Sequence, residues 1–125
     1  MDIIITNQSD APIYEQIKEQ IKAQIVSGDL IEGEALPSMR LLAKELKVSI
    51  ITTKRAYEEL EREGYIESYT GKGSFVKGVN KEALKEQTLY EIQNYLEMVL
   101  EKADVAGISK QEVEEMLHIL YEERE

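Results

Sequence analysis

The sequence contains no cysteine and only one histidine, and these two shortages exclude several kinds of chemistry. Without cysteine the chain can form no disulfide and no thiolate metal site, and it has no thiol nucleophile. His118 alone provides no cluster of imidazole ligands for zinc and no histidine-based acid–base pair. Acidic pairs such as Glu58 and Glu59 have no nucleophile or substrate pocket beside them. We therefore expect a protein that is not an enzyme, with no catalytic residue, no metal site and no cofactor.

The chain also lacks long apolar segments. No apolar run exceeds four residues, whereas a helix needs about 20 such residues to cross a bilayer. The first 30 residues lack the basic start, the long apolar stretch and the small-residue cleavage site of a signal peptide. We expect a cytoplasmic protein without a membrane partner.

Acidic residues outnumber basic ones by 25 to 15, which gives a net charge of -10. This balance argues at first against a nucleic-acid partner, because contacts to phosphates need lysine and arginine. The distribution of charge is more informative than its sum. Residues 79–125 contain twelve acidic and five basic residues, whereas residues 38–57, the basic segment, contain one acidic residue, Glu45. The bases of this segment are Arg40, Lys44, Lys47, Lys54 and Arg55.

The first predicted helix begins near Asp10, a capping residue, and Pro12, which suits the first helical turn. Isoleucines recur every four residues from position 13 to position 25 and mark one face of this helix. Gly28 ends it. Residues 1–9 include a short β-branched run and are expected to form a strand or an ordered arm.

Two more helices, the first of them short, follow a loop that closes with Pro37. Ser38 is the predicted cap of the first, and Ser49 is the predicted cap of the second, which runs to Gly64. Three leucines of the first helix are expected to face inward: Leu41, Leu42 and Leu46. The apolar positions of the second fall mainly in its second half, so its N-terminal end is expected to project from the body of the domain.

Residues 65–78 predict a β-hairpin. Two short runs with β-branched and aromatic residues flank a turn in which Gly71 and Gly73 supply the necessary backbone freedom, with Lys72 at the tip. Two helices joined by a turn of about three residues form a helix-turn-helix, and the hairpin adds a wing. In this motif the N-terminal end of the second helix enters the DNA major groove while the first helix crosses the backbone.

The predicted DNA contacts lie at two helix N-termini and at the tip of the wing. Each N-terminus offers free N–H groups and partial positive charge for phosphate. Hydroxyl and basic side chains there can bond phosphates or base edges. The residues predicted to contact double-stranded DNA are Ser38, Arg40, Ser49, Ile50, Thr52, Thr53, Lys54, Arg55, Gly71, Lys72 and Gly73.

Residues 79–125 predict two amphipathic helices. The first runs from Asn80 to about Ala103, where a break follows. Ser109 and Glu112 form a capping box for the second. The sequence therefore predicts a mainly α protein with a small β-hairpin: a winged helix-turn-helix DNA-binding domain over residues 1–78 and a short two-helix dimerisation domain over residues 79–125.

The apolar stripes of these two helices need a partner, because helices of this length cannot bury both faces alone. They could pack back on the N-terminal domain, but pairing with the same helices of a second copy is the favoured alternative and gives a two-fold homodimer. The predicted interface residues are Leu89, Ile92, Leu96, Val99, Val113, Met116, Leu117 and Leu120.

Four segments, in order, resemble the GntR family of bacterial regulators: PIYEQIKEQI, GDL-x-x-G-x-x-LPS-x-R-x-LA, VS-x-x-T-x-KRAYEELEREGYIES and GKGSFV. The short two-helix tail is similar to that of the YtrA subfamily. The resemblance implies a homodimeric winged-helix repressor, often of genes for membrane transporters. It also implies that Arg40 contacts DNA backbone and bases, that residues 49–55 begin the recognition helix, and that Gly71 is the wing-tip glycine.

Four residues depart from the family pattern. Ile50 and Ile51 stand where polar residues are common, so contact with thymine methyl groups is the alternative to polar base readout. Thr53 stands where a buried valine is common, which leaves a core position as the alternative to a DNA contact. Lys47 replaces a frequent turn glycine, and a left-handed backbone there would cost ~1 kcal/mol.

The favoured function is that of a repressor that occupies a palindromic operator, and there are two functional alternatives. A winged-helix module that binds another protein, without an operator of its own, fits the overall acidity and would show no salt-sensitive affinity for DNA. A sensor that releases DNA when a small-molecule effector binds would need a pocket of several hundred cubic ångströms. The short tail leaves room for such a pocket only at a dimer interface or in an interdomain cleft.

Overall fold

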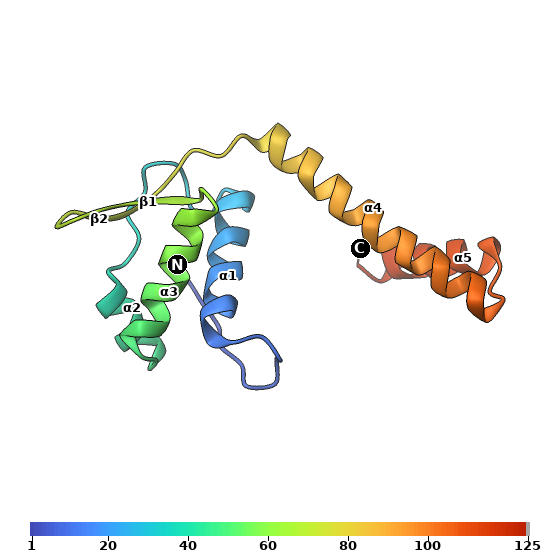
Figure 1. Ribbon diagram of the computed structural model, residues 1–125, viewed down its shortest axis with the longest axis horizontal. Helices are drawn as coiled ribbons and strands as arrows, with labels where there is room; N and C mark the ends of the chain where they lie inside the picture. Colours follow the sequence, from blue (N-terminus) through green and yellow to red (C-terminus); the bar gives the residue numbers. More distant parts are fainter. Residues whose placement is uncertain (125) are drawn as a thin grey trace. The chain divides into compact units, whose positions relative to one another are not determined.

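The computed structural model describes residues 1–124, which form two compact units (Figure 1). The first unit comprises residues 1–81, and the second begins at Glu82. In chain order the elements are α1 (Ile13–Ser27), α2 (Met39–Leu46), α3 (Ile50–Arg62), β1 (Ile66–Tyr69), β2 (Gly73–Val76), α4 (Lys81–Ala106) and α5 (Lys110–Glu123). The mainly α fold with one small hairpin is as predicted.

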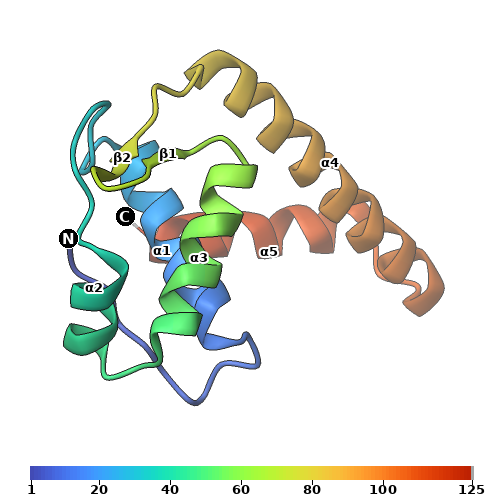
Figure 2. The same ribbon diagram turned by 60° about the vertical axis from the view of Figure 1, so that its left-hand side comes forward.

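A small core holds the first unit together. Both α1 and α2 pack against α3 (Figure 2). The buried apolar side chains from α1, α2, α3 and the hairpin include Ile17, Ile21, Ile25, Leu42, Ala56, Tyr57, Leu60, Ile66 and Val76. Full burial of a large apolar side chain contributes about 1.5–3 kcal/mol relative to exposure, so this core is the main source of the unit's stability.

The first helix begins one residue after Pro12. The Pro12 carbonyl accepts hydrogen bonds from the backbone N–H groups of Glu15 and Gln16, both at 3.1 Å. The expectation that Asp10 caps this helix is wrong, because Pro12 occupies the N-cap position and no side chain caps it. At the other end Gly28, with φ +90°, ends the helix in the left-handed conformation that glycine adopts most readily.

Serine caps start α2 and α3, as predicted. Ser38 Oγ accepts the N–H of Leu41 at 3.1 Å, and Ser49 Oγ accepts the N–H of Ile51 at 3.1 Å.

Lys47 ends α2 with φ +58° and is the only non-glycine residue with positive φ in residues 1–124. The expectation that Leu41 faces inward is wrong: it is 47% exposed, since it lies about 100° around the helix from the buried Leu42.

The wing is an antiparallel hairpin of β1 and β2. Its register pairs Ile66 with Val76, and both side chains face the core. The loop between α1 and α2 adds a short third segment, in which Ala35 bridges to Phe75 and the Leu36 N–H donates to a β2 carbonyl at 2.9 Å. The wing is therefore anchored on both edges of β2.

The N-terminal arm lies along α1 and is held by three glutamines one helical turn apart. The Ile4 N–H donates to the side-chain oxygen of Gln20 at 2.8 Å, and the Gln20 side-chain amide donates to the Ile4 carbonyl at 2.6 Å. The backbone of Thr6 forms the same two bonds with Gln16, both at 3.0 Å. A third glutamine donates to the Asp2 carbonyl at 2.8 Å. These glutamines are Gln16, Gln20 and Gln24. Four helical residues rise about 6 Å, close to two residues of an extended strand, so the side-chain amides act as a substitute strand.

An ion-pair cluster joins α1 to the residue that follows α3. Lys18 Nζ and Lys22 Nζ lie 3.1 and 3.0 Å from the two carboxylate oxygens of Glu63. Partial burial alone would raise the pKa of Glu63, but the two lysine hydrogen bonds lower it overall. The Lys22 ammonium also lies 5.1 Å from the centre of the Tyr65 ring. The cluster therefore fixes the C-terminal end of α3 against α1.

The second unit is a pair of helices that reverses at Gly107, where φ is +70°. The first helix extends to Ala106, three residues past the predicted end at Ala103, because residues 104–106 keep helical geometry before the glycine. Ser109 Oγ accepts the N–H of Glu112 at 3.2 Å and thereby caps α5, as predicted. No helix in the described part of the chain is long and apolar enough to span a membrane.

Candidate nucleic-acid interface

The opening turn of α3 projects into solvent. Ser49 and Lys54 are exposed, and Thr52 is half-buried. Ile50 and Ile51 are 45% and 74% exposed. Two large apolar side chains and a capped helix N-terminus thus form a surface that can enter a groove.

Thr53, predicted among the DNA contacts, is instead a core residue. Its side chain is 0% exposed, and its hydroxyl donates to the carbonyls of Met39 at 2.8 Å and Ile50 at 3.1 Å. A neighbouring bond has a similar role: the Tyr57 hydroxyl donates to the Pro37 carbonyl at 2.7 Å. Burial, followed by the negative charge of Glu45, raises the pKa of Tyr57 well above its usual value and keeps that donor protonated. Thr53 therefore fixes α3 to α2 and does not reach DNA.

The bases of residues 1–78 fall into two groups. Those outside the basic segment and the wing tip form ion pairs with acidic side chains; they are Lys18, Lys22, Arg62 and Lys77. Within the segment, Lys54 makes one long contact with Glu58, 4.0 Å between Nζ and Oε1. The others have no acidic partner within residues 1–124; they are Arg40, Lys44, Lys47, Arg55 and, at the wing tip, Lys72. Within residues 1–78 the unneutralised basic side chains thus belong to the basic segment and the wing tip.

On α2, Arg40 and Lys44 are both exposed and lie four residues apart, so they share one face of the helix. Arg40 sits in the first helical turn, next to the N-terminus that Ser38 caps. Its guanidinium therefore adds to the partial positive charge of that helix end.

Arg55 has an aromatic partner that the sequence did not reveal. Its guanidinium carbon lies 3.9 Å from the centre of the Tyr14 ring, which belongs to α1. The two residues are far apart in the sequence, and the helical pattern marks Tyr14 only as a neighbour of the isoleucine stripe. No local signal predicts the contact.

The wing ends in a tight turn that presents Lys72. The Lys72 N–H donates to the Tyr69 carbonyl at 3.0 Å, while Gly71 and Gly73 have φ of +78° and +106°. Tyr69 was not predicted as part of the site, yet it is 51% exposed and its ring lies 6.2 Å from that of Phe75. The two-residue periodicity of the strands, which puts both rings on one face, was the signal that could have found this pair.

Comparison with known proteins decides the family. Residues 13–76 match the family described as bacterial regulatory proteins, gntR family. The chain is 36% identical over 115 residues to the HTH-type transcriptional repressor YtrA of Bacillus subtilis (strain 168), over 92% of this chain and 88% of that protein. The protein belongs to the GntR family.

Solved structures agree with this assignment. A transcriptional antiterminator from Listeria monocytogenes EGD-e has a TM-score of 0.73 and 31% identity, covering 97% of this chain and 90% of its own. AraR(DBD), solved in complex with operator ORX1, has a TM-score of 0.54 and 26% identity, covering 61% of this chain and 95% of its own. This GntR-family chain is thus a DNA-binding transcription regulator and not an enzyme, with repressors among its relatives.

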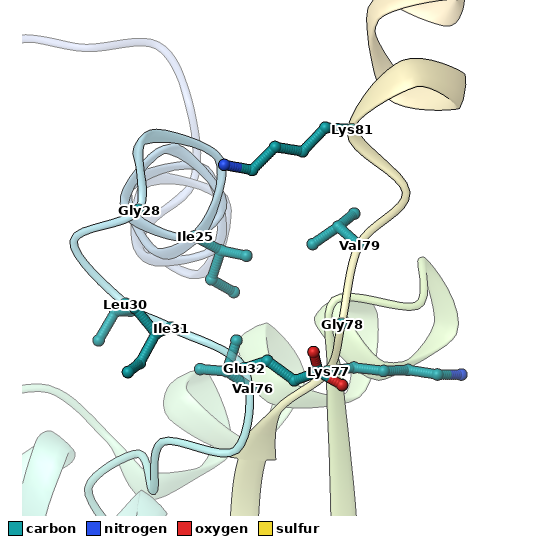
Figure 3. A pocket seen from close by; sticks show the side chains of 10 residues that line it. All are labelled: Ile25, Gly28, Leu30, Ile31, Glu32, Val76, Lys77, Gly78, Val79 and Lys81. Carbon is teal, nitrogen blue, oxygen red and sulfur yellow. The ribbon is translucent and has the colours of Figure 1, made fainter.

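The GntR-family chain also has a small open cavity near the end of its first unit (Figure 3). The cavity has a volume of about 190 Å³, and its lining includes Ile25, Leu30, Val76 and Val79, with Lys81 at its edge. Ligand sites usually occupy about 300–1,000 Å³. The volume of this cavity lies below that range.

Proposed function

We propose that this regulator is a cytoplasmic homodimeric repressor that occupies a palindromic operator, with genes for membrane transporters among its targets. The observation that carries the proposal is the segregation of charge in the first unit. Bases beside the N-termini of α2 and α3 and at the wing tip lack acidic partners in residues 1–124, apart from the long contact of Lys54 with Glu58, whereas the other bases of residues 1–78 are paired. Free cations beside helix N-termini match the needs of a phosphate backbone.

Different side chains serve affinity and specificity. Phosphate contacts come from Arg40, Lys54, Arg55 and Lys72, which set the register of the protein on the duplex but carry no sequence information. The Ser38 and Ser49 oxygens accept helix N–H bonds, so their hydroxyl protons remain available for phosphate oxygens. Specificity comes from the start of α3 and from the wing, where the backbone of Gly71 and Gly73 approaches an adjacent DNA groove closely. The exposed Ile50 and Ile51 contact thymine methyl groups.

The homodimer is supported by the second unit, which has almost no core of its own. Ala103 is its only buried residue in the described range. The predicted interface residues of α4 and α5 are 45–56% exposed, apart from the half-buried Val113. Exposed apolar side chains in such number mark an interaction site.

The width of the apolar band on α4 points to a partner with two helices. Leu89 and Leu96 lie on one stripe, while Tyr95 and Met98, 69% and 63% exposed, lie about 100–180° away from them around the helix. A helix that is apolar over so much of its circumference is surrounded by other helices. The same α4–α5 pair of a second copy supplies both neighbours and builds a four-helix bundle.

A dimer of this kind presents two recognition helices to half-sites about one helical turn, ~34 Å, apart. Joining two weak half-site contacts raises their combined affinity by a factor of about 10²–10⁴ through effective concentration. The operator is then occupied and the promoter blocked.

In vitro selection from a random-sequence duplex library tests this function. We expect enrichment of a two-fold symmetric motif by the wild-type protein. Arg40→Ala should weaken binding to the selected duplex at least tenfold, because it removes a charge-assisted contact of about 1.5–3 kcal/mol. Arg62→Ala is the matched control, since that exposed arginine lies on the same domain but pairs with Glu59 at 2.9 Å. Failure to enrich any motif would favour the protein-binding module instead.

A further inference from the structure

The contact between Tyr14 and Arg55 links α1 to the recognition helix α3. At 3.9 Å from the ring centre, the guanidinium carbon lies within the ~6 Å range of cation–π attraction. Tyr14 is half-buried in the first two turns of α1, whereas Arg55 is exposed in the second turn of α3. A fixed ring therefore supports an otherwise flexible side chain.

The acidic side chains near Arg55 are engaged elsewhere. Glu58 contacts Lys54 at 4.0 Å, and Glu59 makes a bidentate pair with Arg62 Nη1 at 2.9 and 3.2 Å. Within the described residues no carboxylate lies within ion-pair distance of Arg55. Its positive charge is thus held in place by an uncharged ring and is not neutralised.

The position of Arg55 on α3 suits a contact to the DNA backbone. Arg55 follows Ile51 by four residues and Thr52 by three, so all three lie on the same side of the helix. It lies about 9 Å along the axis from Ser49 at the N-terminal end. The first turn enters the groove, so a side chain this far back meets the phosphates at the groove edge.

We propose that Tyr14 is a positioning residue that holds the Arg55 guanidinium ready to clamp a phosphate beside the major groove. This inference rests on the operator-binding function proposed above. An unrestrained arginine loses part of its rotamer entropy on binding. The Tyr14 ring restricts the side chain before DNA arrives, and the edge N–H groups of the guanidinium remain available as donors.

A double-mutant cycle tests the proposal on the full-length protein. The probe is the selected duplex, with a mixed-sequence 30-base-pair duplex as a second probe, and binding is followed by fluorescence anisotropy over a range of salt concentrations. Arg55→Ala should weaken binding to both duplexes about tenfold and reduce the steepness of the salt dependence by about two, because one phosphate contact is lost from each chain of the dimer. Tyr14→Leu should weaken binding about threefold without changing the salt dependence, because the charge remains. Tyr14→Phe should bind like the wild type.

The decisive quantity is the effect of Tyr14→Leu in the Arg55→Ala background. We expect none, because the ring acts only through the arginine. An equal loss in both backgrounds would assign Tyr14 a general structural role and overturn the proposal, as would wild-type affinity of Tyr14→Leu. Thermal unfolding of each variant monitors folding. Should Tyr14→Leu not fold, Arg55→Lys keeps the charge but loses the planar group, and wild-type binding by that variant would also overturn the proposal.

The outcomes separate this inference from the function on which it rests. If the wild-type protein binds the selected duplex but Arg55→Ala binds equally well, only the role of Tyr14 and Arg55 is overturned. If the wild-type protein shows no salt-dependent binding to either duplex, both the proposed operator function and the role of Tyr14 and Arg55 are overturned.

Discussion

In the first unit Ile17, Ile21 and Leu60 are 0% exposed, whereas in the second unit Leu89, Leu96 and Leu117 are 54%, 49% and 47% exposed. Both units are built from amphipathic helices, yet only the first brings three helices and a hairpin onto one core. The difference separates two kinds of stability. The first unit is stabilised by contacts within one chain, and the second unit depends on a partner, which we propose to be a second copy.

The largest expected effect comes from a charge placed on the exposed stripe of α4. Leu96→Asp should convert the dimer to a monomer, because a carboxylate cannot be buried without a partner. Affinity for the selected duplex should then fall about 100-fold or more, as the avidity of two half-sites is lost. Light scattering after size exclusion gives the mass. The control Asn94→Asp adds the same charge about half a turn away and should leave a dimer; a dimeric Leu96→Asp protein would contradict the proposed interface.

A truncation in the core of the first unit tests the other side of the comparison. Leu60→Ala should lower the free energy of unfolding by about 3 kcal/mol, the usual cost of a cavity at a fully buried leucine. Urea denaturation followed by circular dichroism measures the loss. Because this core lies within one chain, the loss should be the same at two protein concentrations that differ tenfold. A loss below about 1 kcal/mol would mean that Leu60 is not part of a packed core.

A smaller effect is expected at the turn between α2 and α3. Lys47→Gly should raise the free energy of unfolding by about 1 kcal/mol, because glycine adopts the left-handed conformation at φ +58° without strain. Lys44→Gly, in the interior of α2, serves as a control and should lower stability by about the same amount. Thermal unfolding compares the two, and destabilisation by Lys47→Gly would rule out the strained turn.

The smallest effect concerns the ion pairs of Glu63. Its pKa is lowered in the folded protein, so its contribution is present above the ordinary value of 4.5 and is lost as the pH falls through the folded pKa. Glu63→Gln should therefore cost about 0.5–1 kcal/mol at pH 7 and progressively less as the pH falls below 4.5. Chemical denaturation at several pH values measures this difference. A cost that stays constant down to pH 3 would show that the carboxylate charge is not the cause.

Local signals in the sequence predicted the architecture well. The serine caps at positions 38, 49 and 109 each bond a backbone N–H of the first helical turn, because capping depends on residues two or three apart. The left-handed turn at Lys47 was expected from the family resemblance, because glycine is frequent at this turn position. Such features need no knowledge of distant neighbours.

Features that depend on distant parts of the chain were missed or wrong. The hydroxyl of Thr53 bonds a carbonyl 14 residues away, which turned an apparent DNA contact into a core residue. Tyr14 and Arg55 meet only because α1 packs on α3. The periodicity of a helix shows which face is buried, but it does not show which side chain of another element lies opposite.

The salt dependence of DNA binding tests the central claim most directly. A dimer that contacts phosphates with Arg40, Lys54, Arg55 and Lys72 of each chain neutralises about eight phosphates, so the logarithm of the binding constant should fall with the logarithm of salt concentration with a slope of about -7. Arg40→Ala should make this slope shallower by about two, one contact for each chain, while Arg62→Ala leaves it unchanged. A slope near zero, or equal changes in both variants, would contradict a DNA-binding face formed by the unpaired bases.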